Sequence, residues 1–379
     1  MKLFKTIILL LATMAVTVNA CTIFVLTDAK QTLFCNNEDW ISPETRLWFV
    51  PGGEDYYGCL YVGFNNGWGQ GGLNTEGLAY DWVAGYTQEW QPGPELKTAR
   101  GNPSERMLES CATVEEAITF FKTYKDPSFS HARILLADKT GASAVIGAKD
   151  GKLDIQTKHQ SHGFGYGEKQ LHTLLPQKST PTLSNGVALL RACKQPGRAS
   201  TKYANVFNLT TGDIWLLPRP DLQAQVQLNL TEEMKKGPHY YDIPKIEQQL
   251  KQPPQPLHNN MKRFVFEQYQ PIPEMDAAAT EQFRQLLADA TAGCMDAEDY
   301  HASLWQGLKG QQKDIQAGLL EFGALVSVKP VEYQKEKEQR RFRYILTFKH
   351  ARLLMHLVFD ANNKALKLDT EAVEFFGEG

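Results

Sequence analysis

The residue with the clearest chemical potential is Cys21, because of what precedes it. The first 20 residues carry two lysines near the start, an apolar run from Ile7 to Val16, and small or β-branched residues at Val18-Asn19-Ala20. This order of features is typical of a removable signal peptide. Cleavage after Ala20 would leave Cys21 as the first residue. Its thiol and its free α-amine would then form a nucleophile with its own base.

Two other interpretations of Cys21 stay open at this stage. A cysteine that follows a signal sequence can be lipidated, although lipidated proteins usually place Leu and Ala or Ser before it, and Asn19 fits that pattern poorly. Cys21 can also be an ordinary cysteine that happens to begin the mature chain. The segment that follows it has to decide between these interpretations.

The residues after Cys21 predict a hairpin that returns to it. Residues 21–28 are rich in β-forming residues, a turn is expected around Lys30, and residues 32–40 form the returning strand. Pairing centred on Lys30 places Cys21 opposite Asp39, and opposed residues share a face with Cβ atoms ~5 Å apart. A bulge in the turn would shift this register by one residue. Asp39 is therefore expected to hold the α-amine against the thiol; its alternative role is to cap backbone groups at the strand end.

The remaining elements predict two domains of the α+β class. Up to residue 250, a Gly-rich strand region, a helical segment at 104–124 and several short strands alternate. The Pro-rich run at 252–256 predicts a linker. Beyond it come an amphipathic helix at 277–292, further helices, and four strand-like runs between 323 and 368. We therefore expect a signal peptide (1–20), a catalytic domain (21–250), a linker (251–260) and a small α+β accessory domain (261–379).

The leader, the Cys21-Thr22 start and the closing Asn36-Asn37-Glu38-Asp39-Trp40 together resemble the N-terminal-nucleophile hydrolases. The nearest branch is that of choloylglycine hydrolase, penicillin V acylase, acid ceramidase and isopenicillin-N acyltransferase. The segments 72–79, 137–145 and 201–208 resemble further elements of this family, so the resemblance covers roughly residues 21–250. It implies a four-layer αββα sandwich and cleavage of a linear C–N amide bond. The segment after Pro256 loosely resembles cone-like folds and shows no catalytic pair.

The sequence departs from the family at several positions. Asn36 stands where relatives have an arginine beside the nucleophile, and an amide holds no charge. Ala84 occupies the place of a family oxyanion asparagine, with Asp81 and Trp82 near it. The candidates for substrate or oxyanion binding are Asn36, Asn37, Trp82, Asn205 and Arg198. For Asn205 a strand-end role, and for Arg198 or Lys202 a solvated surface position, remain alternatives.

Composition excludes several other classes of protein. The net charge of −3 implies no polyanionic partner such as a nucleic acid, and no apolar run after the leader is long enough to span a bilayer. The six cysteines form no CxxC or Cys/His cluster with zinc spacing, so neither a metal nor a cofactor is expected. If Cys21 must remain a free thiol, five cysteines are left, and at least one more must be unpaired.

These observations predict an exported amidase, periplasmic or secreted, that acts on a small acylated molecule through a Cys21 thioester. Acyl transfer to another amine is a close variant, and self-association of the chain is left open. A secreted cysteine dipeptidase is the next enzymatic alternative. A lipid-anchored or soluble binding protein that keeps the fold without activity is the alternative from a different class.

Overall fold

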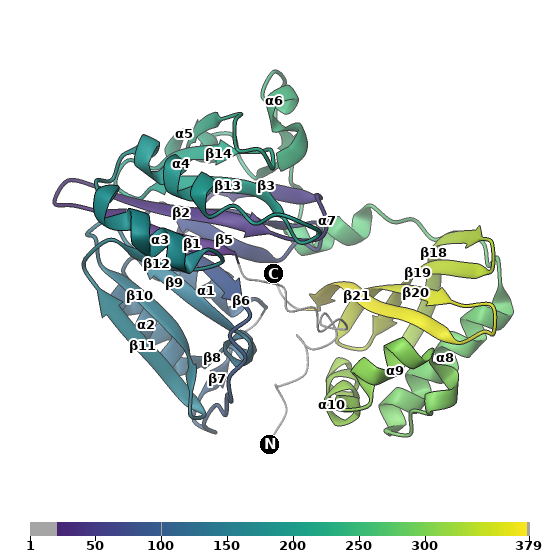
Figure 1. The fold of residues 1–379 in the computed structure, drawn as a ribbon. Helices are drawn as coiled ribbons and strands as arrows, with labels where there is room; N and C mark the ends of the chain where they lie inside the picture. The colour runs from purple at the N-terminus through teal and green to yellow at the C-terminus, as the bar shows by residue number, and fades with distance from the viewer. Residues whose placement is uncertain (1–20, 100, 377–379) are drawn as a thin grey trace. The chain divides into compact units, whose positions relative to one another are not determined.

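The computed structural model describes residues 21–99 and 101–376, so the predicted signal peptide lies outside the described residues. The described chain forms two compact units, residues 21–258 and residues 259–376, and each is treated by itself. Figure 1 shows the strands and helices of both units.

The first unit contains a six-stranded antiparallel sheet that begins at Cys21. Its strand order is β12-β1-β2-β13-β14-β15. The strands are β1 (Thr22–Thr27), β2 (Thr32–Asp39), β12 (His162–Gly165), β13 (Thr201–Asn208), β14 (Asp213–Leu217) and β15 (Val226–Asn229). Because β1 lies between β12 and β2, the start of β1 is enclosed by backbone on both sides.

A second antiparallel sheet in the same unit has nine strands, in the order β11-β10-β9-β6-β5-β4-β3-β16-β17. They are β3 (Thr45–Val50), β4 (Cys59–Phe64), β5 (Gly69–Asn74), β6 (Ala79–Ala84), β9 (Ala132–Ala137), β10 (Ser143–Lys149), β11 (Lys152–Lys158), β16 (His239–Asp242) and β17 (Gln255–Pro256). Within the segment expected to be a linker, Gln255 and Pro256 thus pair with β16 as an edge strand.

The two sheets pack face to face, with helices outside each. Apolar side chains from both sheets form one core, with Ile23 and Phe34 from the first sheet against Leu60 and Val62 from the second. The other face of the first sheet packs against α3 (Glu168–Leu174) and α4 (Leu183–Ala192), which Figure 1 shows over β1, β2 and β13. Helices α1 (Pro103–Ser110) and α2 (Val114–Thr123) contact the second sheet. The predicted α+β class is confirmed.

The hairpin register differs from the prediction by one residue. Thr27 pairs with Thr32 and Thr22 with Asn37, so paired residue numbers sum to 59 rather than 60. The turn is tighter than expected because Asp28 Oδ1 accepts hydrogen bonds from the N–H groups of Lys30 (2.8 Å) and Gln31 (3.0 Å). Continuing this register places Cys21 opposite Glu38. The prediction that Asp39 lies directly opposite Cys21 is therefore wrong.

The second unit is built on a four-stranded antiparallel sheet in the order β18-β19-β20-β21. The strands are β18 (Leu325–Glu336), β19 (Gln339–Phe348), β20 (Ala351–Phe359) and β21 (Ala365–Phe375). Helices α8 (Ala277–Ala292), α9 (Ala302–Leu308) and α10 (Gln312–Phe322) share its apolar core. The predicted helix at 277–292 is confirmed. It begins after Asp276, whose carboxylate accepts from the Ala279 N–H, and ends before Gly293 at φ 75°.

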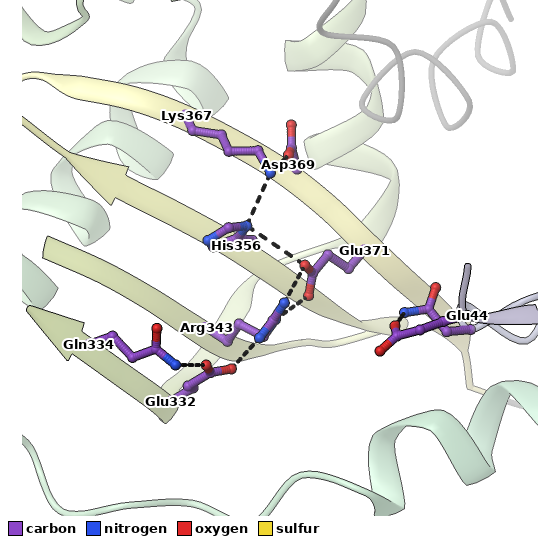
Figure 2. Close-up of polar contacts among 9 residues, drawn as sticks. Glu44, Glu332, Gln334, Arg343, His356, Lys367, Asp369 and Glu371 are labelled. Carbon is purple, nitrogen blue, oxygen red and sulfur yellow. Dashed lines mark hydrogen bonds and ion pairs between the residues drawn. The ribbon is translucent and has the colours of Figure 1, made fainter. Parts of the chain in front are cut away.

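The other face of this sheet carries a polar row and a small apolar cluster. Glu332, Arg343, His356 and Asp369 are successive register partners across the four strands, and Arg343 also binds Glu371 at 2.7 Å (Figure 2). Beside this row, α7 (Met261–Glu267) packs Phe266 against the sheet. The ion pairs of the row are partly exposed, and such pairs contribute about 0–1 kcal/mol each. The row keeps this part of the sheet solvated.

The helices and the cysteines bear on the expected class of protein. None of the helices within the described residues is long and apolar enough to cross a membrane. All six cysteines are free thiols, of which five are buried and Cys294 is exposed.

Candidate active site

The backbone of Cys21 is held at the start of β1 by the neighbouring strand β12. The Cys21 carbonyl oxygen accepts from the Tyr166 N–H at 3.1 Å. Gly165 lies so close that an added Cβ would be 1.9 Å from this oxygen, and its φ of 115° is one that residues with side chains rarely adopt. Glycine at position 165 is therefore required for Cys21 to occupy its position.

The Cys21 sulfur lies between a carboxyl group and a backbone N–H. Sγ donates to Glu38 Oε1 at 3.3 Å and accepts from the Asp39 N–H at 3.4 Å. Only 9% of the residue is exposed. The thiol is thus oriented from two sides by consecutive residues of β2.

The Glu38 carboxyl is itself held by two further side chains. Asn36 Nδ2 and Tyr203 OH donate to Glu38 Oε2, at 3.2 Å and 3.4 Å. Tyr203 is the register partner of Glu38 on β13. Because Oε2 is occupied by these donors, Oε1 is directed to the sulfur.

Asp39 is anchored through a hydroxyl on the opposite strand. Thr201 Oγ1 donates to Asp39 Oδ1 at 2.5 Å, while the same hydroxyl accepts from the Gln195 N–H at 2.9 Å. The second carboxyl oxygen of Asp39, Oδ2, is buried without a hydrogen-bond partner. The carboxyl is therefore fixed and still has an acceptor atom available.

The second sheet contributes Asp81 to the same layer. Asp81 stands on β6 between Ala79 and Val83, which both face the core between the sheets. It is fully buried, and its Oδ2 atom has no partner. From the first sheet, Asn36 and Asn205 are register partners on the face that looks toward β6, both fully buried. Asn36 Oδ1 and both polar atoms of the Asn205 side chain have no partner.

Burial dominates the protonation of this group. It raises the pKa of the Cys21 thiol well above its ordinary value, and the charges of Glu38, Asp39 and Asp81 act in the same direction. Burial raises the pKa of Glu38 to about 7, against the hydrogen bonds it accepts. It also raises the pKa of Asp39 to about 8, although the Thr201 hydroxyl and the Lys202 charge oppose this shift. For Asp81 burial and then the Glu38 charge raise the pKa well above the ordinary value.

The structure brings some of the predicted site residues together and separates others. Asp39 contacts the Cys21 sulfur through its backbone N–H, and Asn36 is linked to the sulfur through Glu38. Asn205 is the register partner of Asn36 on β13 and shares its inward face. Asn37 faces the helix layer, where its Nδ2 donates to the Leu190 carbonyl at 2.9 Å.

Trp82 and Arg198 are also placed apart from the sulfur. Trp82 points to the outer side of its sheet, and its indole N–H donates to Ser104 Oγ at 3.0 Å. Since side chains alternate along a strand, Asp81 rather than Trp82 faces the core. Arg198 is exposed in the loop before β13, whereas Lys202 is the cation whose charge acts on Asp39.

Sequence reasoning missed Glu38, Asp81, Tyr203 and Thr201. Glu38 could have been found from the Asp28 turn, because a two-residue loop moves it opposite Cys21. Tyr203 and Thr201 then follow from strand pairing. Asp81 was noted only as a neighbour of Ala84, because nothing in the local sequence shows that it approaches Cys21 from the other sheet.

No group of three or more Cys, His, Asp and Glu side chains within the described residues is arranged to hold a metal ion. The side chains that the structure gathers near the Cys21 sulfur carry carboxyl and amide groups.

Comparison with known proteins finds similarity at the level of solved structures. No family model matches the chain. No curated protein sequence matches it either. The chain is structurally similar to penicillin V acylase from Agrobacterium tumefaciens, with 15% identity and a TM-score of 0.45, over 59% of this chain and 91% of that chain.

It is also similar to two variants of the conjugated bile acid hydrolase from Clostridium perfringens. One has 13% identity and a TM-score of 0.47, the other 15% identity and a TM-score of 0.44; each covers 59% of this chain and 96% of that chain. Similarity at this level assigns neither an activity nor a substrate to this chain. Its function has to be argued from its own residues.

Proposed function

We propose that this protein is an exported amidase that cleaves a linear C–N amide bond of a small acylated substrate, with Cys21 as the N-terminal nucleophile. The observation that carries the proposal is the position of the Cys21 sulfur, between Glu38 Oε1 and the Asp39 N–H, on the first residue after a leader-like segment. The layered arrangement of helix, sheet, sheet and helix agrees with the N-terminal-nucleophile fold that the sequence resembles.

The proposed reaction begins with transfer of the thiol proton to the free α-amine of Cys21. The sulfur forms a bond to the substrate carbonyl carbon, and the resulting ammonium then protonates the leaving amine as the C–N bond breaks. The amine restored on Cys21 takes a proton from water, whose oxygen attacks the thioester. The acid leaves and the thiol is regenerated. If an amine replaces water in the second step, the product is a new amide.

Two neighbours have defined parts in this scheme. Asp39 Oδ2, which has no partner, accepts from the Cys21 ammonium, while Thr201 holds Oδ1. Asn205 Nδ2, also without a partner, donates to the oxyanion of the tetrahedral intermediate. Lys202 adds a positive charge that acts on Asp39.

A second candidate function is binding without catalysis. It is favoured by the charges that act on Cys21, which are the carboxylates of Glu38, Asp39 and Asp81. Among the side chains of the described residues, no cation acts on the sulfur to stabilise a thiolate, in contrast to family members with arginine at the position of Asn36. An inactive relative would keep the layered fold and bury the thiol in its neutral form.

The test identifies the first residue of the mature protein and measures its amide-cleaving activity. The full chain is expressed with its leader, and the exported protein is analysed by intact mass and N-terminal sequencing. We expect a chain that begins with unmodified Cys21 and cleaves members of a panel of acyl-amino acids, penicillins, bile-salt conjugates and N-acyl lactones. Replacing Cys21 by Ala or Ser should reduce turnover by about 1000-fold or more.

The matched control is Cys35→Ser, because Cys35 is a fully buried thiol of β2 that faces the helices. It should retain activity. A lipidated Cys21, or full activity in the Cys21→Ala protein, would rule out the proposed mechanism. Correct processing without activity on any amide would favour the binding protein.

A further inference from the structure

The inward faces of the two sheets hold a polar group inside an apolar core. Cys21, Asn36 and Glu38 belong to the first sheet, and Asp81 to the second, and they are surrounded by residues such as Val83, Phe207 and Leu135. Strands β1 and β6 contact each other across the layer. Glu38 is the charged group with the largest effect on Asp81, and Asp81 also acts on Cys21. The two carboxyl groups therefore face the same small region beside the sulfur.

The hydrogen-bonding atoms without partners in this region are mainly acceptors. Asn36 Oδ1, Asn205 Oδ1 and, in the ionised form of Asp81, its Oδ2 are buried acceptors without a donor, against one unpaired donor, Asn205 Nδ2. The orientation of the Asn36 amide is set by its bond to Glu38 Oε2. A buried carboxyl or amide oxygen without a donor is costly. The group that completes this region must bring several N–H donors.

The backbone around Asp81 is shaped to keep its carboxyl in place. A Cβ on Gly71, the register partner of Asp81 on β5, would lie 2.2 Å from Asp81 Oδ2. Asp81 Oδ1 accepts from the Trp82 N–H at 2.7 Å. Oδ2 thus lies over Gly71 of the neighbouring strand β5, on the core face of the second sheet.

We propose that Glu38 and Asp81 form a subsite for an ammonium group that the substrate carries one carbon away from the scissile carbonyl. This inference rests on the proposed function and names its substrate class: amides of α-amino acids with a free amino group. An ammonium brings three N–H donors and a positive charge, which matches both the unpaired acceptors and the paired carboxyl groups. An anionic substituent at the same place would meet Glu38 and Asp81 as like charges.

The spacing follows from the distance between the sulfur and Glu38. Oε1 is 3.3 Å from Sγ, so a substrate carbon bonded to sulfur lies beside the carboxyl group. An ammonium on the next carbon reaches a hydrogen-bonding position, whereas a longer spacer carries it past Glu38. Cys21 is the most exposed member of the group, so a small ligand meets the sulfur first.

Protons accompany the binding of such a group. Burial keeps Glu38 and Asp81 prone to protonation, and a cation between them favours their charged forms. The other titratable groups that act on this region are Cys21, Asp39, Tyr203 and, through Asp39, Lys202. We expect ammonium binding to release protons near neutral pH.

The experiment uses three para-nitroanilides with the same leaving group and different acyl groups: alanyl, propionyl and malonyl. They place a cation, a neutral methyl group or an anion one carbon from the carbonyl. For the mature enzyme we expect the ratio of kcat/KM for alanyl over propionyl to be about tenfold to a hundredfold, and the malonyl compound to be the poorest. In Asp81→Asn this ratio should fall to about 1. Because it is taken within one variant, a change in the reactivity of Cys21 cancels.

Asp126→Asn is the control, since Asp126 is an equally buried carboxyl at the start of a short helix outside this layer, where it accepts from the Ser128 N–H. It should keep the wild-type ratio. A preference for the propionyl or malonyl compound, or an unchanged ratio in Asp81→Asn, overturns the inference.

A binding measurement separates this inference from the proposed function. Calorimetry with the Cys21→Ala protein compares alaninamide, propionamide and malonamic acid in two buffers of different ionisation enthalpy. Alaninamide should bind best and release protons, and Asp81→Asn should lose this preference. If these results appear while no anilide is cleaved, the ammonium site stands and the amidase proposal fails. If alaninamide binds no better than propionamide, the ammonium site is refuted whatever the activity.

Discussion

Replacing Glu38 by Gln removes the negative charge nearest to the Cys21 sulfur and keeps the size of the side chain. Glu38 Oε1 is 3.3 Å from Sγ. At this distance and an effective dielectric constant of about 20, two negative charges repel by about 5 kcal/mol, or about 3 to 4 pH units of the thiol pKa. Once Glu38 is ionised, above its pKa of about 7, further deprotonation of Cys21 is strongly opposed.

The expected consequence is a difference in how thiol reactivity depends on pH. In the wild-type protein the alkylation rate of Cys21 should rise to about pH 7 and then level off, because each gain in thiolate is offset by the growing charge on Glu38. In Glu38→Gln the rate should continue to rise. The variant should react about 10-fold faster at pH 8 and about 100-fold faster at pH 9, with similar rates at pH 6.

The assay measures iodoacetamide labelling of Cys21 by peptide mass spectrometry across pH 5 to 9, in matched mature proteins. Because the α-amine of Cys21 titrates in both, its contribution cancels from the comparison. Equal rates at pH 9 would show that Glu38 does not oppose the thiolate. Slower labelling of the variant across the whole range would refute the electrostatic argument and make Glu38 the proton acceptor of the thiol.

Three further predictions concern the residues that hold the site. Gly165→Ala should abolish activity and destabilise the protein in thermal unfolding, since its Cβ would lie 1.9 Å from the Cys21 oxygen. The control is Gly151→Ala, where φ is also positive but a Cβ meets no close atom; it should lower the free energy of unfolding by only about 1 kcal/mol. Equal effects of the two substitutions would contradict the argument. Asp39 has its pKa raised to about 8, so the stability linked to its protonation is present below about pH 4 and is lost as pH rises through 8. Asp39→Asn should therefore increase the free energy of unfolding, measured by urea denaturation, by roughly 2–5 kcal/mol at pH 8 and change it little at pH 4. A larger increase at pH 4 than at pH 8 would be inconsistent with a buried carboxyl. Thr201→Val removes a hydrogen bond that lowers the pKa of Asp39, so the acid limb of the pH–activity profile should move to higher pH. Thr201→Ser keeps the hydroxyl and should restore the wild-type profile. An unchanged profile in Thr201→Val would exclude a role for Asp39 in the acid limb.

Local patterns were sufficient for the elements that depend on neighbours in sequence. The richness in β-forming residues and the expected turn predicted both strands of the first hairpin, and the amphipathic pattern predicted the helix at 277–292 with its bounds. Such signals are local because strand and helix periods are set by the backbone itself. The same reasoning placed a carboxylate at the end of the second strand, near Cys21.

These patterns did not predict the pairing register of β1 and β2, because that register depends on the geometry of one turn. The side chain of Asp28 closes a two-residue loop, and this shift by one residue exchanges Asp39 for Glu38 as the direct neighbour of the thiol. Since successive side chains in a strand point to opposite faces, an error of one residue changes which of them meets the sulfur. The same alternation directs Asp81 into the core and Trp82 out of it.

The sequence by itself determined the position of the thiol, directly after a leader-like segment, and the hairpin that presents it. Only the tertiary structure decided which polar groups surround that thiol, because Glu38, Asp81 and Tyr203 come from three strands in two sheets. Their meeting depends on how the sheets stack, and stacking is a sum of many weak apolar contacts between residues far apart in the chain. No single stretch of sequence contains that information.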